Sequence, residues 1–234
     1  MTIDFKTTPV EVAQRQPHPL SPVRLVDLYF HPKKYFSNTQ SLDRLSALLI
    51  AAGLMGISGS MGQIDKKIIQ AELGHATTNW EAMSSWLLSS WGNYWLTVVS
   101  TGLIGAVFLW FLGGWWYKKR LQWSGAAVPS PRLARQVYAL QELVIAGPTV
   151  LIALVQTALF TDYREAWLSD GFWSLSLAVF IFWSCWTSYC AATTAFQLSK
   201  PKARIWFLVL PVLLYVGAIG VFGALYALVS GNAV

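Results

Sequence analysis

The three histidines and two cysteines are the residues of this chain best suited to metal or redox chemistry. His18, His31 and His75 lie outside every long apolar run, and none stands at metal-ligand spacing from another ligand. The paired histidines that would ligate haem inside a membrane are therefore missing. Cys185 and Cys190 share one apolar run and, five positions apart, point about 140° away from each other around a helix. We predict no metal site, no cofactor and no disulfide between these cysteines.

The sequence also lacks the motifs that mark common catalytic sites. It contains no Gly-x-Ser-x-Gly, no His-Glu-x-x-His and no glycine-rich phosphate loop with its lysine. A pump would need charge at membrane depth, and only Glu142, near the start of a long apolar run, comes close. Arg135 and Tyr138 can share its helical face, so an interfacial ion pair is the simpler account of Glu142. We predict no catalytic residues and take Glu142 and Gln156, which lies deeper in the same run, as the candidate polar site.

The composition indicates an environment other than water for most of the chain. Hydrophobic residues make up 55% of the 234 residues and charged residues only 12%, whereas an average soluble chain is about one-quarter charged. This excludes a soluble enzyme, a disordered tail protein and a disulfide-stapled secreted domain. Five apolar runs reach the ~20 residues that a bilayer-spanning helix needs, at about residues 45–62, 94–117, 139–160, 172–198 and 205–230. Strict two-residue alternation is absent, so we predict an all-α integral membrane bundle of five transmembrane helices.

The charges outside these runs predict the orientation of the chain. Fourteen of the 17 lysines and arginines precede the first span or lie in the loops after the second and fourth spans. These segments share one side of a five-span chain, and cytoplasmic segments carry the excess of basic residues. We therefore expect a cytoplasmic N-terminus. Because the cations flank hydrophobic spans, anionic lipid headgroups are their expected partner and nucleic acid is not.

We expect three regions along the chain. Residues 1–22 form a polar, proline-rich cytoplasmic tail, and residues 45–230 form the five-helix transmembrane domain. Between them, residues 23–44 carry Leu25 and Leu28 at helical spacing with cations nearby, which is typical of an amphipathic segment on the membrane surface. An ordinary connector that touches the bundle is an equal alternative for this segment.

Small residues recur in the first and last spans, where they allow close helix packing without a hydrophobic driving force. The glycines that we expect at helix contacts are Gly53, Gly56, Gly59, Gly62, Gly217, Gly220 and Gly223. Packing within one bundle is favoured over a seam between two copies.

Tryptophans gather where the spans should meet the membrane surfaces, as in an aromatic belt. The expected interfacial anchors are Trp91, Trp95, Trp115, Trp116 and Trp206. Trp80, Met83, Leu87 and Trp91 share one face of a second interfacial helix. Deeper in the fourth span, Trp183, Trp186 and Tyr189 are expected to pack or to contact lipid, with a hydrophobic cofactor pocket as the alternative.

The order of several soft motifs resembles the Yip1-domain family of five-span membrane proteins. The matching features are His31-Pro-Lys-Lys-Tyr-Phe, Gly113-Gly114, Arg135-Gln-Val-Tyr-Ala-Leu leading to Gly147-Pro148, the stretch from Trp186 to Lys200, and Leu210-Pro211. Eukaryotic members carry Asp-Leu-Tyr-Gly-Pro before the first span, but here Asp27-Leu28-Tyr29 is followed by Phe30-His31-Pro32, so the chain looks like a bacterial member. The resemblance implies residence in the bacterial cytoplasmic (inner) membrane and self-association or partner binding, and it supplies no catalytic residues.

These observations favour a non-enzymatic membrane protein that binds other membrane proteins, or itself, or organises a membrane assembly. A small transporter or channel is the first alternative, with Gln141, Glu142, Gln156, Thr193 and Thr194 as lining residues. An accessory subunit of a membrane redox or photosynthetic complex is the second.

Overall fold

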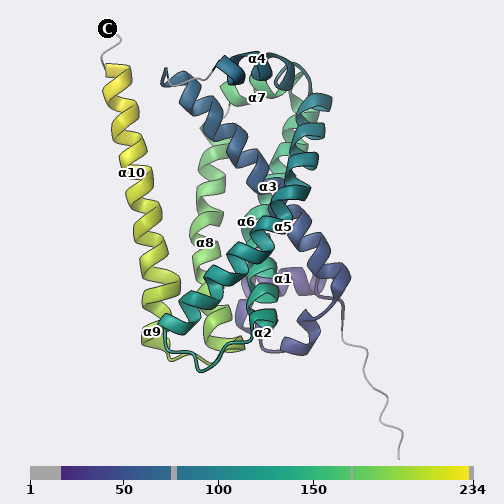
Figure 1. Ribbon diagram of the computed structural model, residues 1–234, viewed down its shortest axis with the longest axis vertical. Coiled ribbons are helices and arrows are strands. Elements are labelled where there is room, and N and C mark those ends of the chain that lie inside the picture. The colour runs from purple at the N-terminus through teal and green to yellow at the C-terminus, as the bar shows by residue number, and fades with distance from the viewer. Residues whose placement is uncertain (1–16, 75–77, 170, 232–234) are drawn as a thin grey trace, which may run out of the picture.

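The computed structural model describes residues 17–74, 78–169 and 171–231, and this part of the chain is helical with no strand. Five helices are long and apolar enough to cross a membrane, which confirms the predicted all-α five-span architecture (Figure 1). The long helices are α3 (Leu45–Glu72), α5 (Trp91–Trp123), α6 (Pro131–Leu159), α8 (Gly171–Ala195) and α10 (Leu210–Gly231). The short ones are α1 (Pro22–Phe30), α2 (Pro32–Phe36), η1 (Thr39–Leu42), α4 (Thr78–Leu87), α7 (Tyr163–Leu168), α9 (Lys200–Arg204) and the π-helix η2 (Ile205–Val209).

The first three long helices are longer than the apolar runs in the sequence, because they include polar residues at one or both ends. α3 runs on to Glu72, since Ile64 and Ile68 keep one buried face after the apolar run has ended. The Ser90 hydroxyl accepts a hydrogen bond from the Asn93 amide and caps α5, as side chains at helix N-termini often do. Hydropathy therefore located the spans, whereas caps and amphipathic faces set the helix ends.

Helices α3, α5 and α6 pack against one another, and α8 packs on α6. α3 and α5 cross where Gly56 faces Gly102: a Cβ built on Gly56 would lie 2.1 Å from the Gly102 carbonyl oxygen. Only glycine fits such a crossing, as in the small-residue contacts of other membrane helices. Nearer the end of α5, a Cβ on Gly113 would meet the Tyr138 ring at 2.2 Å. Glycines of α5 therefore allow close contact with both α3 and α6.

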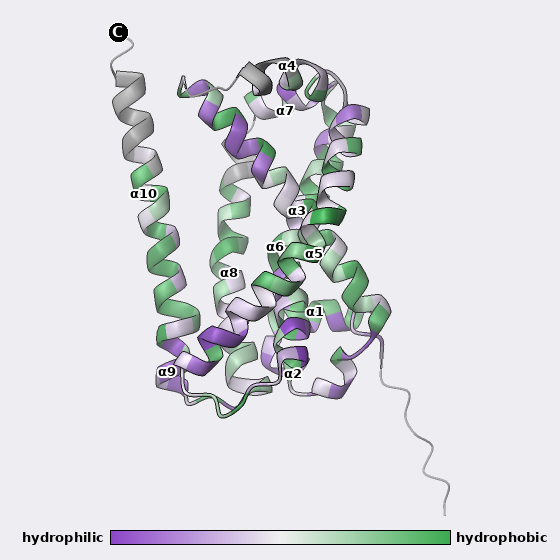
Figure 2. Cartoon of the chain, viewed as in Figure 1, coloured by the Kyte–Doolittle hydropathy of each residue, from purple (hydrophilic) through white to green (hydrophobic). Residues whose placement is uncertain are grey.

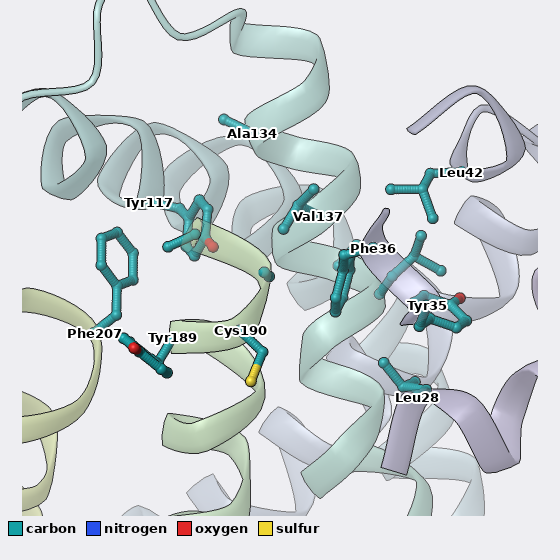
Figure 3. Packing of buried hydrophobic residues seen from close by; sticks show 14 of the residues in the cluster. Leu28, Tyr35, Phe36, Leu42, Tyr117, Ala134, Val137, Tyr189, Cys190 and Phe207 are labelled. Carbon is teal, nitrogen blue, oxygen red and sulfur yellow. The ribbon is translucent and has the colours of Figure 1, made fainter. Parts of the chain in front are cut away.

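The buried side chains form two clusters, one in each half of the bundle. One cluster joins α1 and α2 to the adjacent ends of α5, α6 and α8. Figure 3 shows it, with Phe36 beside Val137 and with Tyr117 near Phe207. The other cluster joins α4 and α7 to the opposite ends of α3, α5 and α6. We call the end that holds α1, α2 and α9 the basic end, and the opposite end the α4 end.

The α1–α2 hairpin occupies the segment predicted as an amphipathic surface element. It is wedged against the bundle: the Tyr29 hydroxyl donates to the Leu143 carbonyl (2.9 Å), and the Trp183 indole donates to the Tyr29 carbonyl (2.7 Å). Burial raises the pKa of Tyr29 from 10 to about 12. Leu28 is buried, whereas Phe30 on the other face of α1 is exposed. The hairpin thus has one apolar face in the protein core and one facing outward.

Candidate functional site

Helix α10 stands apart from the other spans. In its span, 6% of the most apolar 18-residue stretch is buried, against 17–39% in the other four. It contacts η2 and, more sparsely, α8. Figure 1 shows it as a separate column, and Figure 2 shows that its described part is almost uniformly hydrophobic. Leucine, valine and isoleucine side chains of α10 therefore face outward, including Leu213, Leu214, Val216 and Ile219.

The glycines of α10 do not contact another element of the described chain. Built Cβ atoms on Gly217, Gly220 and Gly223 meet nothing within 4 Å. The expected packing of these residues inside one bundle is therefore absent among the described residues, because α10 itself is not packed there. In α3, a built Cβ on Gly56 would meet α5 at the helix crossing, and one on Gly59 would lie 3.2 Å from a Leu109 methyl. Gly53 and Gly62 have open space beside them.

A guanidinium group holds the start of the fifth span. The amide of Leu210 bonds to the Ile205 carbonyl, five residues back, in the π-helix η2. In the same register the Trp206 carbonyl would pair with residue 211, which is Pro211 and has no N–H. The Arg120 guanidinium donates to that carbonyl at 2.6 Å, and its centre lies 4.4 Å from the Phe207 ring centroid. Arg120 therefore satisfies a carbonyl that proline leaves without a partner.

Glu142 lies close enough to Arg120 for their charges to interact. Gln141 hydrogen-bonds its side chain. The predicted partner Arg135 points elsewhere: its Nε donates to the Pro131 carbonyl and its guanidinium lies over the Phe111 ring. The expectation of an Arg135–Glu142 ion pair is thus wrong, because Arg135 is drawn along α6 and toward α5.

Buried polar atoms without a hydrogen-bond partner are common on the three helices around Glu142. Among the described residues they include the Tyr117 hydroxyl, the Gln141 Oε1, and the hydroxyls of Thr187 and Ser188. Buried polar groups are normally satisfied by protein or by ordered water. The basic half of the bundle therefore contains polar atoms that a water molecule or a polar ligand would stabilise.

Gln156 lies in a different place, at the wall of a cavity near the α4 end. This cavity has a volume of about 240 Å³ and is also lined by Asp65, Tyr94, Tyr163 and Trp167. The Tyr163 hydroxyl donates to Asp65, and the Tyr94 and Tyr163 rings stack at 4.1 Å. Burial and the neighbouring Asp65 carboxylate raise the pKa of Tyr163 well above its usual value, so its phenol stays a neutral donor. Glu142 and Gln156 are therefore not one site: they are 14 residues apart on α6, about 21 Å along a straight helix.

Of the predicted anchors, Trp115 and Trp116 are about half exposed at the basic end of α5, and Trp206 packs against Trp123. Trp91 is buried instead, because its indole donates to the Phe160 carbonyl and its ring packs edge-on against Tyr94 and Tyr163. Trp91, predicted as an interfacial anchor, therefore packs among protein side chains.

The other expected anchor and the deep aromatic residues also have protein partners. The Trp95 indole donates to the Thr157 hydroxyl at 2.9 Å. In α8, Trp183 packs on Phe30 and Trp186 on Tyr189. These are packing contacts within the protein.

Residues suited to metal binding are dispersed in the part of the chain that the structure describes. No group of three His, Cys, Asp or Glu side chains gathers there in a way that would hold a metal ion. Cys185 and Cys190 are buried free thiols, and His75 lies outside the described residues. His18 approaches the Ser46 hydroxyl at 3.0 Å and so helps to join the chain before α1 to α3.

Comparison with protein-family models, with curated proteins and with solved structures found no match to this chain. The structural features above are therefore the basis for the function that follows. In the sequence, Arg120 is one of the basic residues that predict the orientation of the chain, and nothing distinguishes Asp65 as a cavity residue. Proline at position 211 was the one available signal that a carbonyl near the start of the fifth span would need an outside donor.

Proposed function

We propose that this integral membrane protein is non-enzymatic and binds a transmembrane helix of a partner protein along α10. The observation that supports the proposal is the separation of α10 from its own bundle, with three glycines facing open space. Membership of the Yip1-domain family, in its bacterial form, and residence in the bacterial inner membrane belong to the same proposal.

Exposure of α10 alone does not distinguish a partner from lipid, because lipid tails solvate leucine and valine as well as another helix does. The three glycines of α10 favour a partner helix over lipid. Each glycine in a helix interior costs about 1 kcal/mol relative to alanine, so Gly217, Gly220 and Gly223 together cost roughly 3 kcal/mol of helix stability. No packing within the described chain offsets this cost. Close approach of a partner backbone would offset it, since small residues allow van der Waals contact between helix axes.

Site-specific photo-crosslinking in native membranes tests the proposal. A photoreactive side chain at Ile219 is expected to give a discrete protein adduct. The same group at Leu103, which is exposed on α5, serves as the control and is expected to give lipid adducts only. Gly220→Ile should weaken the Ile219 adduct by blocking close approach. Lipid adducts alone at both positions would refute partner binding, and the adduct mass tells a second copy from a different protein.

A small transporter is the second candidate, because α6 carries polar groups toward both of its ends. Gln156 lines the cavity near the α4 end, and Glu142 interacts with Arg120 in the basic half. Ionisable groups at membrane depth are costly and are often part of ion or proton pathways.

Proton flux into proteoliposomes that contain a pH-sensitive dye, under an imposed membrane potential, tests the transporter candidate. The candidate expects dissipation by the wild-type protein and its loss in Glu142→Gln and Asp65→Asn. Lys119→Gln is the matched control at the basic end. Equal flux in all four proteins, or none above protein-free vesicles, would remove this candidate.

A further inference from the structure

A groove of about 470 Å³ runs between α3, α4 and α5, whereas α10 packs mainly on η2 and α8. Its lining includes the small residues Gly56, Gly59 and Gly105, with Phe108 and Leu109 beside them. A Cβ built on Gly105 would have only the Gly56 carbonyl oxygen near it, at 3.8 Å. The hollow thus exists because glycines leave the crossing of α3 and α5 without side chains on this side.

The length of the groove matches one leaflet of a bilayer. Along α3 its lining extends from Gly56 to Lys67, which is 11 residues or about 16 Å at the helical rise per residue. The hydrocarbon core of a membrane is about 30 Å thick. A groove that begins at the α4 end therefore reaches about the middle of the membrane and stops there.

Among the described lining residues the charge lies near the outer end of the groove, and the Ser60 and Thr101 hydroxyls, which hydrogen-bond each other, lie halfway along it. Lys67 and Gln63 lie near its outer end, and no carboxylate is among the described residues that line it. Above them, Trp80, Met83 and Leu87 of α4 contribute the single apolar face that the sequence predicted for an interfacial helix. The charged end therefore lies at headgroup level, and the apolar end lies deeper.

The position of α4 disfavours a transmembrane helix of a partner as the occupant. α4 lies across the outer end of the groove, where such a helix would have to continue. A flexible acyl chain has no such requirement, and in a bilayer an apolar groove open to the membrane is filled by lipid.

We propose that this groove is a binding site for one glycerophospholipid from the leaflet at the α4 end. One acyl chain lies over Gly59 and Gly105, and the lipid phosphate binds the Lys67 ammonium. This site is independent of the partner surface proposed on α10.

Native mass spectrometry of the delipidated full chain, with phosphatidylglycerol added back, tests the acyl-chain position. The wild-type protein is expected to retain one phosphatidylglycerol molecule. Gly105→Leu fills the groove and should reduce retention about tenfold. Gly53→Leu is the matched control, because Gly53 has open space beside it and is not among the lining residues. Equal retention by these two variants would overturn the acyl-chain position.

The headgroup is tested with two lipids and two adjacent lysines. The wild-type protein should prefer phosphatidylglycerol over dioleoylglycerol, which lacks the phosphate. Lys67→Gln should reduce that preference about fivefold, the effect of roughly 1 kcal/mol for one lysine at a membrane surface. Lys66→Gln, one residue away, should leave it unchanged. Equal effects of the two substitutions would overturn the role of Lys67, and this pair decides the question even if Gly105→Leu fails to fold.

Discussion

Replacing Arg120 by methionine tests whether the π-helix at the start of the fifth span depends on an outside donor. Methionine keeps an unbranched apolar side chain but removes the guanidinium that donates to the Trp206 carbonyl. A hydrogen bond to a charged group contributes about 1.5–3 kcal/mol, and the contact with the Phe207 ring adds about 0.5–1 kcal/mol. We therefore expect Arg120→Met to lower the free energy of unfolding by about 2–4 kcal/mol.

A second substitution shows whether the lost carbonyl partner is the cause. Pro211→Ala restores a backbone N–H at the position that would pair with the Trp206 carbonyl in the π register. In the Arg120→Met background this change should recover about 1 kcal/mol. The two sites should therefore show a coupling energy of that size in a double-mutant cycle, whereas independent sites would be additive.

The assay is reversible unfolding in mixed micelles by titration with sodium dodecyl sulfate, followed by circular dichroism. Lys119→Met is the matched control, since it removes a neighbouring charge but not the bond to Trp206. Equal stabilities of Arg120→Met and Lys119→Met would refute the assigned role of Arg120. Strict additivity of Arg120→Met and Pro211→Ala would show that proline is not the reason for the contact.

Two further outcomes follow from the packing. Gly56→Ala should prevent the close crossing of α3 and α5, because its Cβ would lie 2.1 Å from a backbone oxygen, whereas Gly53→Ala should leave the thermal midpoint unchanged or raise it slightly. Tyr29, with its pKa raised to about 12, should contribute its full stabilisation below pH 10 and lose it as the pH rises through 12. Thermal midpoints measured between pH 10 and 12 should accordingly fall less steeply in Tyr29→Phe than in the wild-type protein, and parallel curves would contradict this.

The sequence predicted the spans because hydropathy is a local property that each helix carries by itself. It could not predict which glycines lie at contacts. Residues 53, 56, 59 and 62 recur every three positions. Three residues of an α-helix turn through about 300°, so each glycine points about 60° away from the one before it. They therefore spread around α3: Gly56 and Gly59 face α5, whereas Gly53 and Gly62 have open space beside them. The direction of that face depends on a partner helix more than 40 residues later in the chain.

Contacts between distant segments explain the other differences from the sequence predictions. The α1–α2 hairpin is fixed by a bond from Tyr29 to Leu143, and both residues read as unremarkable in isolation. Arg135 and Glu142 were paired by their spacing on one helix, but Arg120 from α5 is the cation that interacts with Glu142. Local spacing lists the partners that one helix offers, whereas packing between helices determines which partner is used.

The two ends of the bundle differ in the size of their hollows, and this bears on where binding can occur. At the basic end, long-range hydrogen bonds tie the hairpin to α6 and α5 to η2, and Arg132 forms a two-pronged ion pair with Asp43 at 2.7–2.8 Å. The α4 end is also tied by long-range hydrogen bonds, such as that from the Trp91 indole to the Phe160 carbonyl. Besides the cavity at Asp65, however, it holds the groove of about 470 Å³ above Gly105, whereas the pocket beside Asp43 at the basic end has about 230 Å³. Small molecules and lipid tails need space that is already open, because creating it in a packed core would cost contacts. We therefore expect ligand binding at the α4 end, whereas substitutions at the basic end should act mainly on the position of α10 and thus on partner binding.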